Sequence, residues 1–348
     1  MVVFTGFLVV ILFANNMFGT KNNMERKLNP DLTVVKEGWE GNIVIDGQFS
    51  NDSILNVTTL DKAFKWMFSE KPQKEEKRND KFKLTVLPFD VSAMQKNSIV
   101  WFGHSSFLID INGIRLITDP NFMDNAINRR KAPLPCSVDS LKSIHYGLFS
   151  HDHRNHFDKN SIKTLLKNNP DMEALIPLGG NRLFTGKKLK NIKRQEAGWY
   201  QEYKLNEDIR IIFLPARHWG RRGLNDINKT LWGSFLIITN HTKIFFAGDT
   251  AYDEHFFKDI HNVFGDMDIC MLTIGAYSPE WFMSPAHTTP EQAVQIFKEL
   301  GGKWFIPMHY GVYGNSDEPP SEPLKRLRNC KINDQLKVLD VGEEFLFQ

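Results

Sequence analysis

Short apolar runs, each bounded by charged or turn-forming residues, recur along the chain from residue 98 onward. Runs of this kind are typical of buried β-strands. Asn112-Gly113 separates two of them and is a strong signal for a two-residue hairpin. The expected strands are 99–102, 107–111, 114–118, 144–149, 174–176, 209–214, 231–238, 243–247, 269–273 and 304–306.

Apolar residues spaced for one face of a helix predict helices over 159–168, 252–263 and 290–300. The last has clear start signals, because Thr288 or Thr289 can cap it and Pro290 suits its first turn. Strands that alternate with helices, with hairpins between, favour mixed sheets covered by helices.

A histidine-rich segment, Ser150-His-Asp-His-Arg-Asn-His-Phe-Asp158, follows the expected strand 144–149. Alternate spacing can turn His151 and His153 to one side of an extended loop, and a bend can bring His156 back toward them. Converging neutral imidazoles suit zinc. The other interpretation is a polar loop that happens to be rich in histidine. The chain has only eleven histidines, so three within six positions favour the metal site.

Four further residues of metal-binding type lie at expected element ends. His218, Asp249 and His309 each follow a strand, and His287 precedes the helix 290–300. Each alone would more often be a structural polar residue. Together with the histidine segment they predict side chains that converge on a metal at the ends of strands.

These residues and their order resemble the metallo-β-lactamase superfamily, whose signature is His-x-His-x-Asp-His followed by a lone His, Asp and His. Within it, the likeness is to the N-acylphosphatidylethanolamine-hydrolysing phospholipase D group, over about residues 96–315. The resemblance implies an α/β (α+β) fold, a four-layer αββα sandwich. The stretches that carry it include Gly103-His-Ser-Ser-Phe-Leu108, Leu116-Ile-Thr-Asp-Pro120, Pro215-Ala-Arg-His-Trp219, Thr230-Leu-Trp-Gly-Ser234, Phe246-Ala-Gly-Asp-Thr250 and Met308-His-Tyr-Gly311.

The resemblance implies two Zn²⁺ ions per chain. By position, His151, His153 and His218 would hold the first, His156 and His309 the second, and Asp249 would bridge both. Asp158 would orient a ligand histidine.

Asn155 stands where the family has an aspartate, and a neutral amide offers only its carbonyl oxygen. Three interpretations follow: a weak second site with Asn155 as a poor ligand, a second metal held without residue 155, or a chain that has lost activity.

The resemblance further implies a zinc-dependent phosphodiesterase of phospholipase D type. It would use a metal-bound hydroxide to hydrolyse N-acylphosphatidylethanolamine-like lipids to phosphatidic acid and N-acylethanolamine. Beside Asp249, the expected catalytic residues are His287, for hydrogen bonding or proton transfer, and Arg222, for a phosphate oxygen. Arg217 and Arg221 are nearby alternatives to Arg222. One alternative function is hydrolysis of a small soluble phosphoester or lactone; another is a metal-poor, non-catalytic binding protein.

Composition adds little that is specific. A formal charge of +2 over 348 residues argues against nucleic acid as a partner, and three distant cysteines form no metal or disulfide pattern. Residues 1–20 are apolar and resemble a signal peptide or a membrane anchor, so we expect a membrane-associated protein. The basic residues that follow favour a cytoplasmic position for this flank, which conflicts with simple export. Residues 21–95 are expected to be a lead-in that packs on a hydrolase domain, 96–348.

Overall fold

The computed structural model describes residues 23–50, 60–124, 129–206 and 208–347. The apolar segment 1–20, expected to be a signal or anchor, lies outside the described residues. Among the helices that are described, none is long and apolar enough to cross a membrane.

Two seven-stranded mixed sheets form the centre of the molecule. The first has the order β10-β9-β8-β7-β6-β5-β17 and the second the order β16-β15-β14-β13-β12-β11-β2. The strands of the first sheet are β5 (Ser98–Trp101), β6 (Phe107–Ile111), β7 (Ile114–Thr118), β8 (Ile144–Leu148), β9 (Glu173–Pro177), β10 (Arg194–Ala197) and β17 (Glu344–Leu346). Those of the second are β2 (Thr33–Val34), β11 (Gln201–Glu202), β12 (Arg210–Leu214), β13 (Ser234–Ile238), β14 (Lys243–Phe246), β15 (Ile269–Thr273) and β16 (Trp304–Met308).

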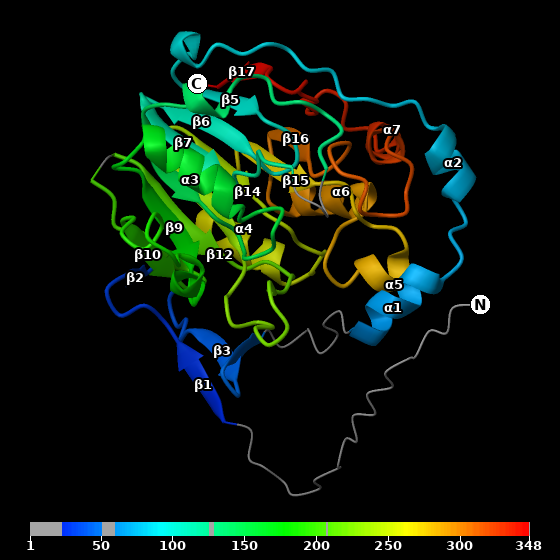
Figure 1. Cartoon of the computed structure of the whole chain (residues 1–348). Coiled ribbons are helices and arrows are strands. Elements are labelled where there is room, and N and C mark those ends of the chain that lie inside the picture. The colour runs from blue at the N-terminus through cyan, green and yellow to red at the C-terminus, as the bar shows by residue number, and fades with distance from the viewer. Residues whose placement is uncertain (1–22, 51–59, 125–128, 207, 348) are drawn as a thin grey trace, which may run out of the picture.

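The two sheets pack face to face, and helices cover their outer faces (Figure 1). Aromatic side chains such as Phe107 of β6 and Phe246 of β14 meet between the sheets, with ring centroids 6.5 Å apart. Helix α3 (Lys159–Asn168) packs on the first sheet through Ile162 and Leu165. On the second sheet lie α4 (Phe256–Phe264) and α6 (Pro290–Glu299), whose buried residues belong to the same hydrophobic cluster as the strands of that sheet. The expected αββα sandwich is therefore confirmed.

Further elements surround this sandwich. In the lead-in, β1 (Met24–Lys27), β3 (Asn42–Ile45) and β4 (Gln48–Ser50) form a small sheet, while β2 lengthens the second large sheet. Within the described residues, short 3₁₀ turns at 91–93, 138–140 and 180–183 interrupt the loops. The remaining helices are α1 (Leu60–Phe68), α2 (Lys74–Asn79), α5 (Glu280–Met283) and α7 (Glu322–Asn329).

The strand directions bring several chain turns to one edge of the sandwich. Strands β14, β15 and β16 are parallel, and β12 is antiparallel to β13, which is antiparallel to β14. The carboxyl ends of β12, β14, β15 and β16 therefore lie at the same edge. In the first sheet β7 and β8 are parallel, and the β5–β6 turn lies beside their carboxyl ends. Ligand sites in sheets of this kind form outside the carboxyl ends of the strands.

Candidate metal centre

The histidine segment leaves β8 and crosses this edge before α3 begins. The structure brings His151, His153 and His218 together, with one ligand nitrogen of each within 4.8 Å of the others. Nδ1 of His153 lies 2.9 Å from Nε2 of His151 and 3.2 Å from Nε2 of His218. This is the set expected for the first metal.

Asp249 lies between this group and a second one. Its Oδ2 atom is 3.2 Å from Nε2 of both His156 and His309, and 4.0 Å from Nε2 of His218. Gly248 makes the approach possible, because its backbone has a φ of 59° and an added Cβ would lie 2.6 Å from Cβ of Ser150. One carboxylate is thus placed to reach both histidine groups.

Several buried polar atoms of this cluster have no hydrogen-bond partner among the described residues. They include Oδ1 of Asp249, Nε2 of His153 and Nδ1 of His287. Unpaired buried polar atoms cost free energy, and a cation at the centre would satisfy them. Imidazole nitrogens with a carboxylate suit zinc and also other first-row transition metals. The residues present therefore fit a two-metal centre.

Burial keeps most of these imidazoles in the neutral form that binds metals. It lowers the pKa of His153 to about 3 and that of His287 to about 4. Burial also holds the pKa values of His151 and His218 well below the usual range. His156 differs: burial opposes its charge, but the carboxylates of Asp249 and Asp119 prevail and raise its pKa to about 10.

The comparisons with known proteins identify the family. The sequence profile of the Beta-lactamase superfamily domain matches residues 115–310. The chain belongs to the metallo-β-lactamase superfamily of hydrolases.

Two relatives carry a more specific name. The N-acyl-phosphatidylethanolamine-hydrolyzing phospholipase D 1 of Caenorhabditis elegans is 31% identical over 262 residues, which cover 70% of this chain and 74% of the relative. The mitochondrial N-acyl-phosphatidylethanolamine-hydrolyzing phospholipase D of Saccharomyces cerevisiae is 32% identical over 238 residues, 65% of this chain and half of the relative.

Solved structures show the same fold. A possible metal-dependent hydrolase from Veillonella parvula superposes with a TM-score of 0.59 at 13% identity and covers 73% of this chain and all of its own. An isothiocyanate hydrolase from Delia radicum gut bacteria superposes with a TM-score of 0.58 at 16% identity, over 72% and 99% of the two chains. At such low sequence identities, these two structures support the fold and nothing more specific.

Asp119 is the carboxylate that orients a histidine of this superfamily site. It follows β7 and accepts hydrogen bonds from Ser150 N (2.7 Å), Ser150 Oγ (2.6 Å) and Nδ1 of His156 (2.8 Å). The sequence-based expectation gave this role to Asp158 and was wrong. Asp158 caps α3 instead, and accepts from Ser161 N at 2.7 Å and Ser161 Oγ at 2.6 Å. The sequence could have indicated this role for Asp119, because this residue directly follows an expected strand, as Asp249 nearly does.

The guanidinium group of Arg222 is hydrogen-bonded to the loop that carries the histidines. Its Nη1 atom donates to the backbone oxygens of Asp152 (2.8 Å) and Phe157 (2.7 Å), which belong to the histidine segment. Arg222 thus holds the loop that carries His151, His153 and His156. Its expected contact with a phosphate oxygen stays a prediction.

His104, which the sequence argument did not single out, also lies in the site. It sits in the β5–β6 turn, only 4% exposed, with its ring centroid 4.1 Å from that of His309. Its Nε2 atom is 2.9 Å from the amide nitrogen of Asn155, so residue 155 contacts this ring. The sequence could have indicated His104 as a site residue, because Gly103-His-Ser-Ser lies at the end of an expected strand and belongs to a stretch that carries the resemblance.

We expect metal binding to release protons. His156 has a pKa of about 10, so below that pH its ring is protonated in the metal-free protein, and a metal must displace the proton to bind Nε2. Affinity at the second site should therefore rise with pH through the neutral range. Calorimetric titrations with zinc, in buffers of different ionisation enthalpy, should show release of about one proton for the second equivalent. A heat that is independent of the buffer would contradict this.

Asn155→Asp should tighten the second metal. The change adds a negative charge of similar size beside His104 and next to the cation, and 1.4 kcal/mol of extra attraction is about a tenfold gain in affinity. The metal concentration for half occupancy should fall, while the rate at saturating metal changes little. Parallel metal titrations of both proteins test this, and equal second-site affinities would show that residue 155 does not sense the metal.

Proposed function

We propose that this protein is a zinc-dependent phosphodiesterase of phospholipase D type, which hydrolyses N-acylphosphatidylethanolamine-like lipids to phosphatidic acid and N-acylethanolamine. The observation that carries the proposal is the carboxylate of Asp249, within 3.2 Å of two histidines and 4.0 Å of a third, in a chain whose relatives carry that enzyme name. The proposed ligands are His151, His153 and His218 for the first zinc, and His156 and His309 for the second. Asp249 would be shared by the two zinc ions, and Asn155 would lie at the edge of the second site.

Two metal ions bound here would neutralise the phosphodiester charge and make water a nucleophile near neutral pH. The protein's own residues would orient the metal ligands and help in proton transfer. Asp119 fixes the ring of His156, and the backbone oxygen of Ala286 lies 2.9 Å from Nδ1 of His218, so both ligand rings are held. His287 has Nδ1 3.9 Å from Oδ2 of Asp249, and its pKa of about 4 leaves it neutral at pH 7, so it could hydrogen-bond the substrate or help in proton transfer beside this carboxylate.

A small cavity of about 60 Å³ opens beside His309 of the second histidine group, and its lining includes both basic residues and the carboxylate of Glu318. His104, Asn155 and His309 line it on the metal side, and Lys77 and Lys131 line it further out. Burial lowers the pKa of Lys77, but opposing carboxylates, Glu318 first among them, favour its charged form. Two cations in the approach to the metals would attract a phosphate group.

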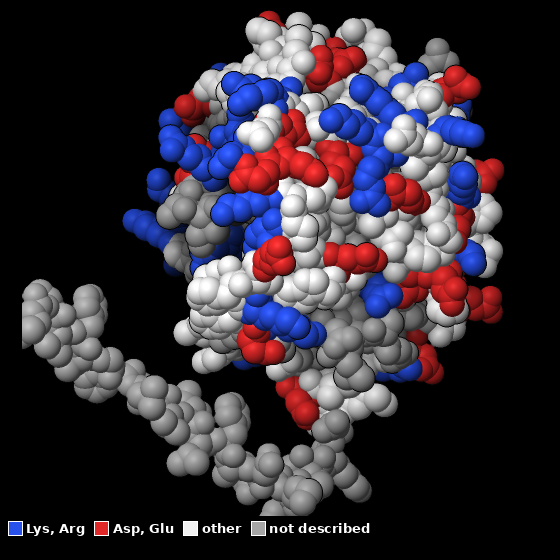
Figure 2. Space-filling view, turned by 90° about the vertical axis from the view of Figure 1, so that its right-hand side faces the viewer, with Lys and Arg blue, Asp and Glu red and all other residues white. Residues whose placement is uncertain are grey.

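An exposed apolar surface lies on α1 and α5, the short helix that precedes His287. It consists of Phe64, Met67, Phe68 and Trp281, which are 56%, 63%, 80% and 45% exposed. Nζ of Lys65 lies 5.1 Å from the centroid of the Trp281 ring. Figure 2 shows that white, uncharged surface is present low on this side of the molecule, with basic and acidic residues next to it. Large apolar side chains beside a lysine suit contact with a lipid surface, which supports a membrane-associated enzyme.

The test is a paired assay of chelator-treated and zinc-reconstituted protein. We expect hydrolysis of N-acylphosphatidylethanolamine in vesicles by the zinc-loaded form only, with phosphatidic acid as one product. A soluble phosphodiester and a lactone should be cleaved far more slowly. Preference for a soluble substrate would favour the alternative of a small-molecule hydrolase. Protein that binds no zinc and cleaves nothing would favour the non-catalytic alternative, which rests on Asn155 alone.

A further inference from the structure

The second metal site has a gap in its ligand set. With Asp249 shared between the two metals, the second would have only His156 and His309 as ligands of its own, because residue 155 is an amide rather than a carboxylate. Zinc sites in proteins usually have three or four protein ligands, of which imidazole nitrogen is among the commonest. A further donor near this position would complete the set.

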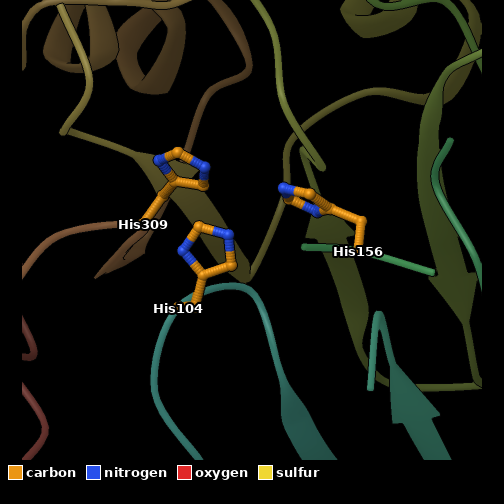
Figure 3. Close-up of side chains that lie close together, drawn as sticks. All are labelled: His104, His156 and His309. Atoms are coloured by element: carbon orange, nitrogen blue, oxygen red, sulfur yellow. The ribbon is translucent and has the colours of Figure 1, made fainter. Parts of the chain in front are cut away.

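A third imidazole lies at this position. One nitrogen of His104 is within 4.8 Å of one nitrogen of His156 and of His309, and all three residues are buried. The ring centroid of His104 is 4.1 Å from that of His309 and 4.9 Å from that of His156. The three rings come from three separate chain segments and turn toward a common space (Figure 3). Three buried imidazoles, two of them 3.2 Å from the shared Asp249 carboxylate, provide the nitrogen donors that a metal site needs.

The backbone holds His104 and His309 in place for this role. Both have left-handed backbone conformations, with φ of 57° and 64°, which are uncommon for residues other than glycine. The amide of His309 donates to the backbone oxygen of His104 at 3.1 Å, and Nε1 of Trp101 donates to the same oxygen at 3.0 Å. The turn of the first sheet and the end of β16 in the second are thereby fixed to each other. Strained conformations that are held in this way occur most often at functional sites.

We propose that His104 supplies the ligand nitrogen that completes the second metal site in place of the missing carboxylate, and that Asn155 holds its ring. The amide of Asn155 contacts Nε2 of His104 at 2.9 Å. An amide can present either its oxygen or its nitrogen to an imidazole, so it can support the ring in either tautomer. Histidine ligands are commonly held through their second nitrogen by a neighbouring polar group. The substitution at 155 thus changes a direct ligand into a supporting residue.

This inference rests on the metal-binding part of the proposed function and not on the lipid substrate. The test compares His104→Asn with Asn155→Ala in the full chain. Asparagine tolerates the left-handed conformation of residue 104, so the backbone is kept while the imidazole is lost. His104→Gly, which adopts this conformation without strain, is the second variant. His255→Gln is the matched control, because the His255 side chain is 84% exposed.

The readouts are second-site affinity for zinc, by chelator competition, and the number of hyperfine-shifted imidazole N–H signals in NMR spectra of cobalt-substituted protein. Loss of a supporting residue lowers metal affinity about 10–100-fold, and loss of a ligand should exceed that range. We expect both His104 variants to lose one N–H signal and more than about 100-fold in second-site affinity. Asn155→Ala should keep every signal and lose less, and His255→Gln should match the native protein.

Unchanged signals and affinity in both His104 variants would overturn the inference. A larger loss of affinity in Asn155→Ala than in the His104 variants would also overturn it, because the amide would then be the ligand. Failure of the proposed function looks different: wild-type protein would bind two metals with six imidazole ligands and still leave the N-acyl lipid intact. That result would reject the substrate and keep the assignment of His104.

Discussion

Asp249→Ala should abolish activity and remove both metals, with a larger effect than the change of any single histidine. The carboxylate lies 3.2 Å from His156 and His309 and 4.0 Å from His218, whereas each histidine belongs to one group. Loss of a residue that only supports a ligand costs about 10–100-fold in affinity or activity, so loss of the shared ligand should exceed about 100-fold at both sites. Elemental analysis and vesicle hydrolysis measure the two effects on the same preparation.

The comparison that tests the bridging role is His156→Ala, which should remove the second metal and leave most of the first. Asp266→Ala serves as the control for removal of a carboxylate, since the Asp266 side chain is 82% exposed and its Oδ1 lies 2.9 Å from Nε2 of His261, which is not one of the proposed ligands. Circular dichroism should show that all three variants remain folded. If His156→Ala proved far more damaging than Asp249→Ala, the bridging assignment would be wrong.

Asp119→Asn should weaken the second metal about 10–100-fold while the first changes little. The native carboxylate accepts hydrogen bonds from the backbone amide of Ser150, the Ser150 hydroxyl and Nδ1 of His156. An asparagine at this position has one acceptor atom, and its amide group would face a donor. A buried donor without an acceptor costs about 1–3 kcal/mol, and the ring of His156 would lose its fixed orientation. Chelator competition at each site measures the change.

Asp158→Asn is the matched control for this variant. It makes the same chemical change two positions after His156, but Asp158 caps α3, and asparagine caps helices about as well as aspartate. Metal affinity and thermal unfolding should both stay close to those of the native protein. A loss of metal affinity in Asp158→Asn, with none in Asp119→Asn, would restore the role that the sequence argument gave to Asp158.

Local pattern predicted most strands of the two large sheets and the helices α3, α4 and α6, but it missed β10 and β17 of the first sheet. The apolar runs between residues 98 and 308 coincide with strands to within a few residues, because a short apolar run between turn signals has few other stable conformations. One run was too long: the strand expected over 231–238 begins at Ser234. The preceding Gly233 donates to the backbone oxygen of Ser150, so this part of the run belongs to the metal-site loops.

Other elements carried no local signal. The strands β2 and β11 have two residues each, and they exist because they pair with each other and β11 with β12. The exposed face of α1 and the short helix α5 also became visible only in the folded chain. Elements of this size depend on contacts with distant segments and not on their own sequence.

The sequence by itself determined the superfamily, the strand-end positions of the candidate ligands and the chemistry they share, because motif spacing and residue type are local properties. Only the tertiary structure decided which side chains meet. Asp119 rather than Asp158 orients His156, Arg222 holds the histidine loop, and His104 joins His156 and His309. These residues lie 37, 65 and 205 positions from partners that they contact, His156, Phe157 and His309. Distances of that kind are set by the way two sheets pack against each other, which no stretch of sequence encodes alone.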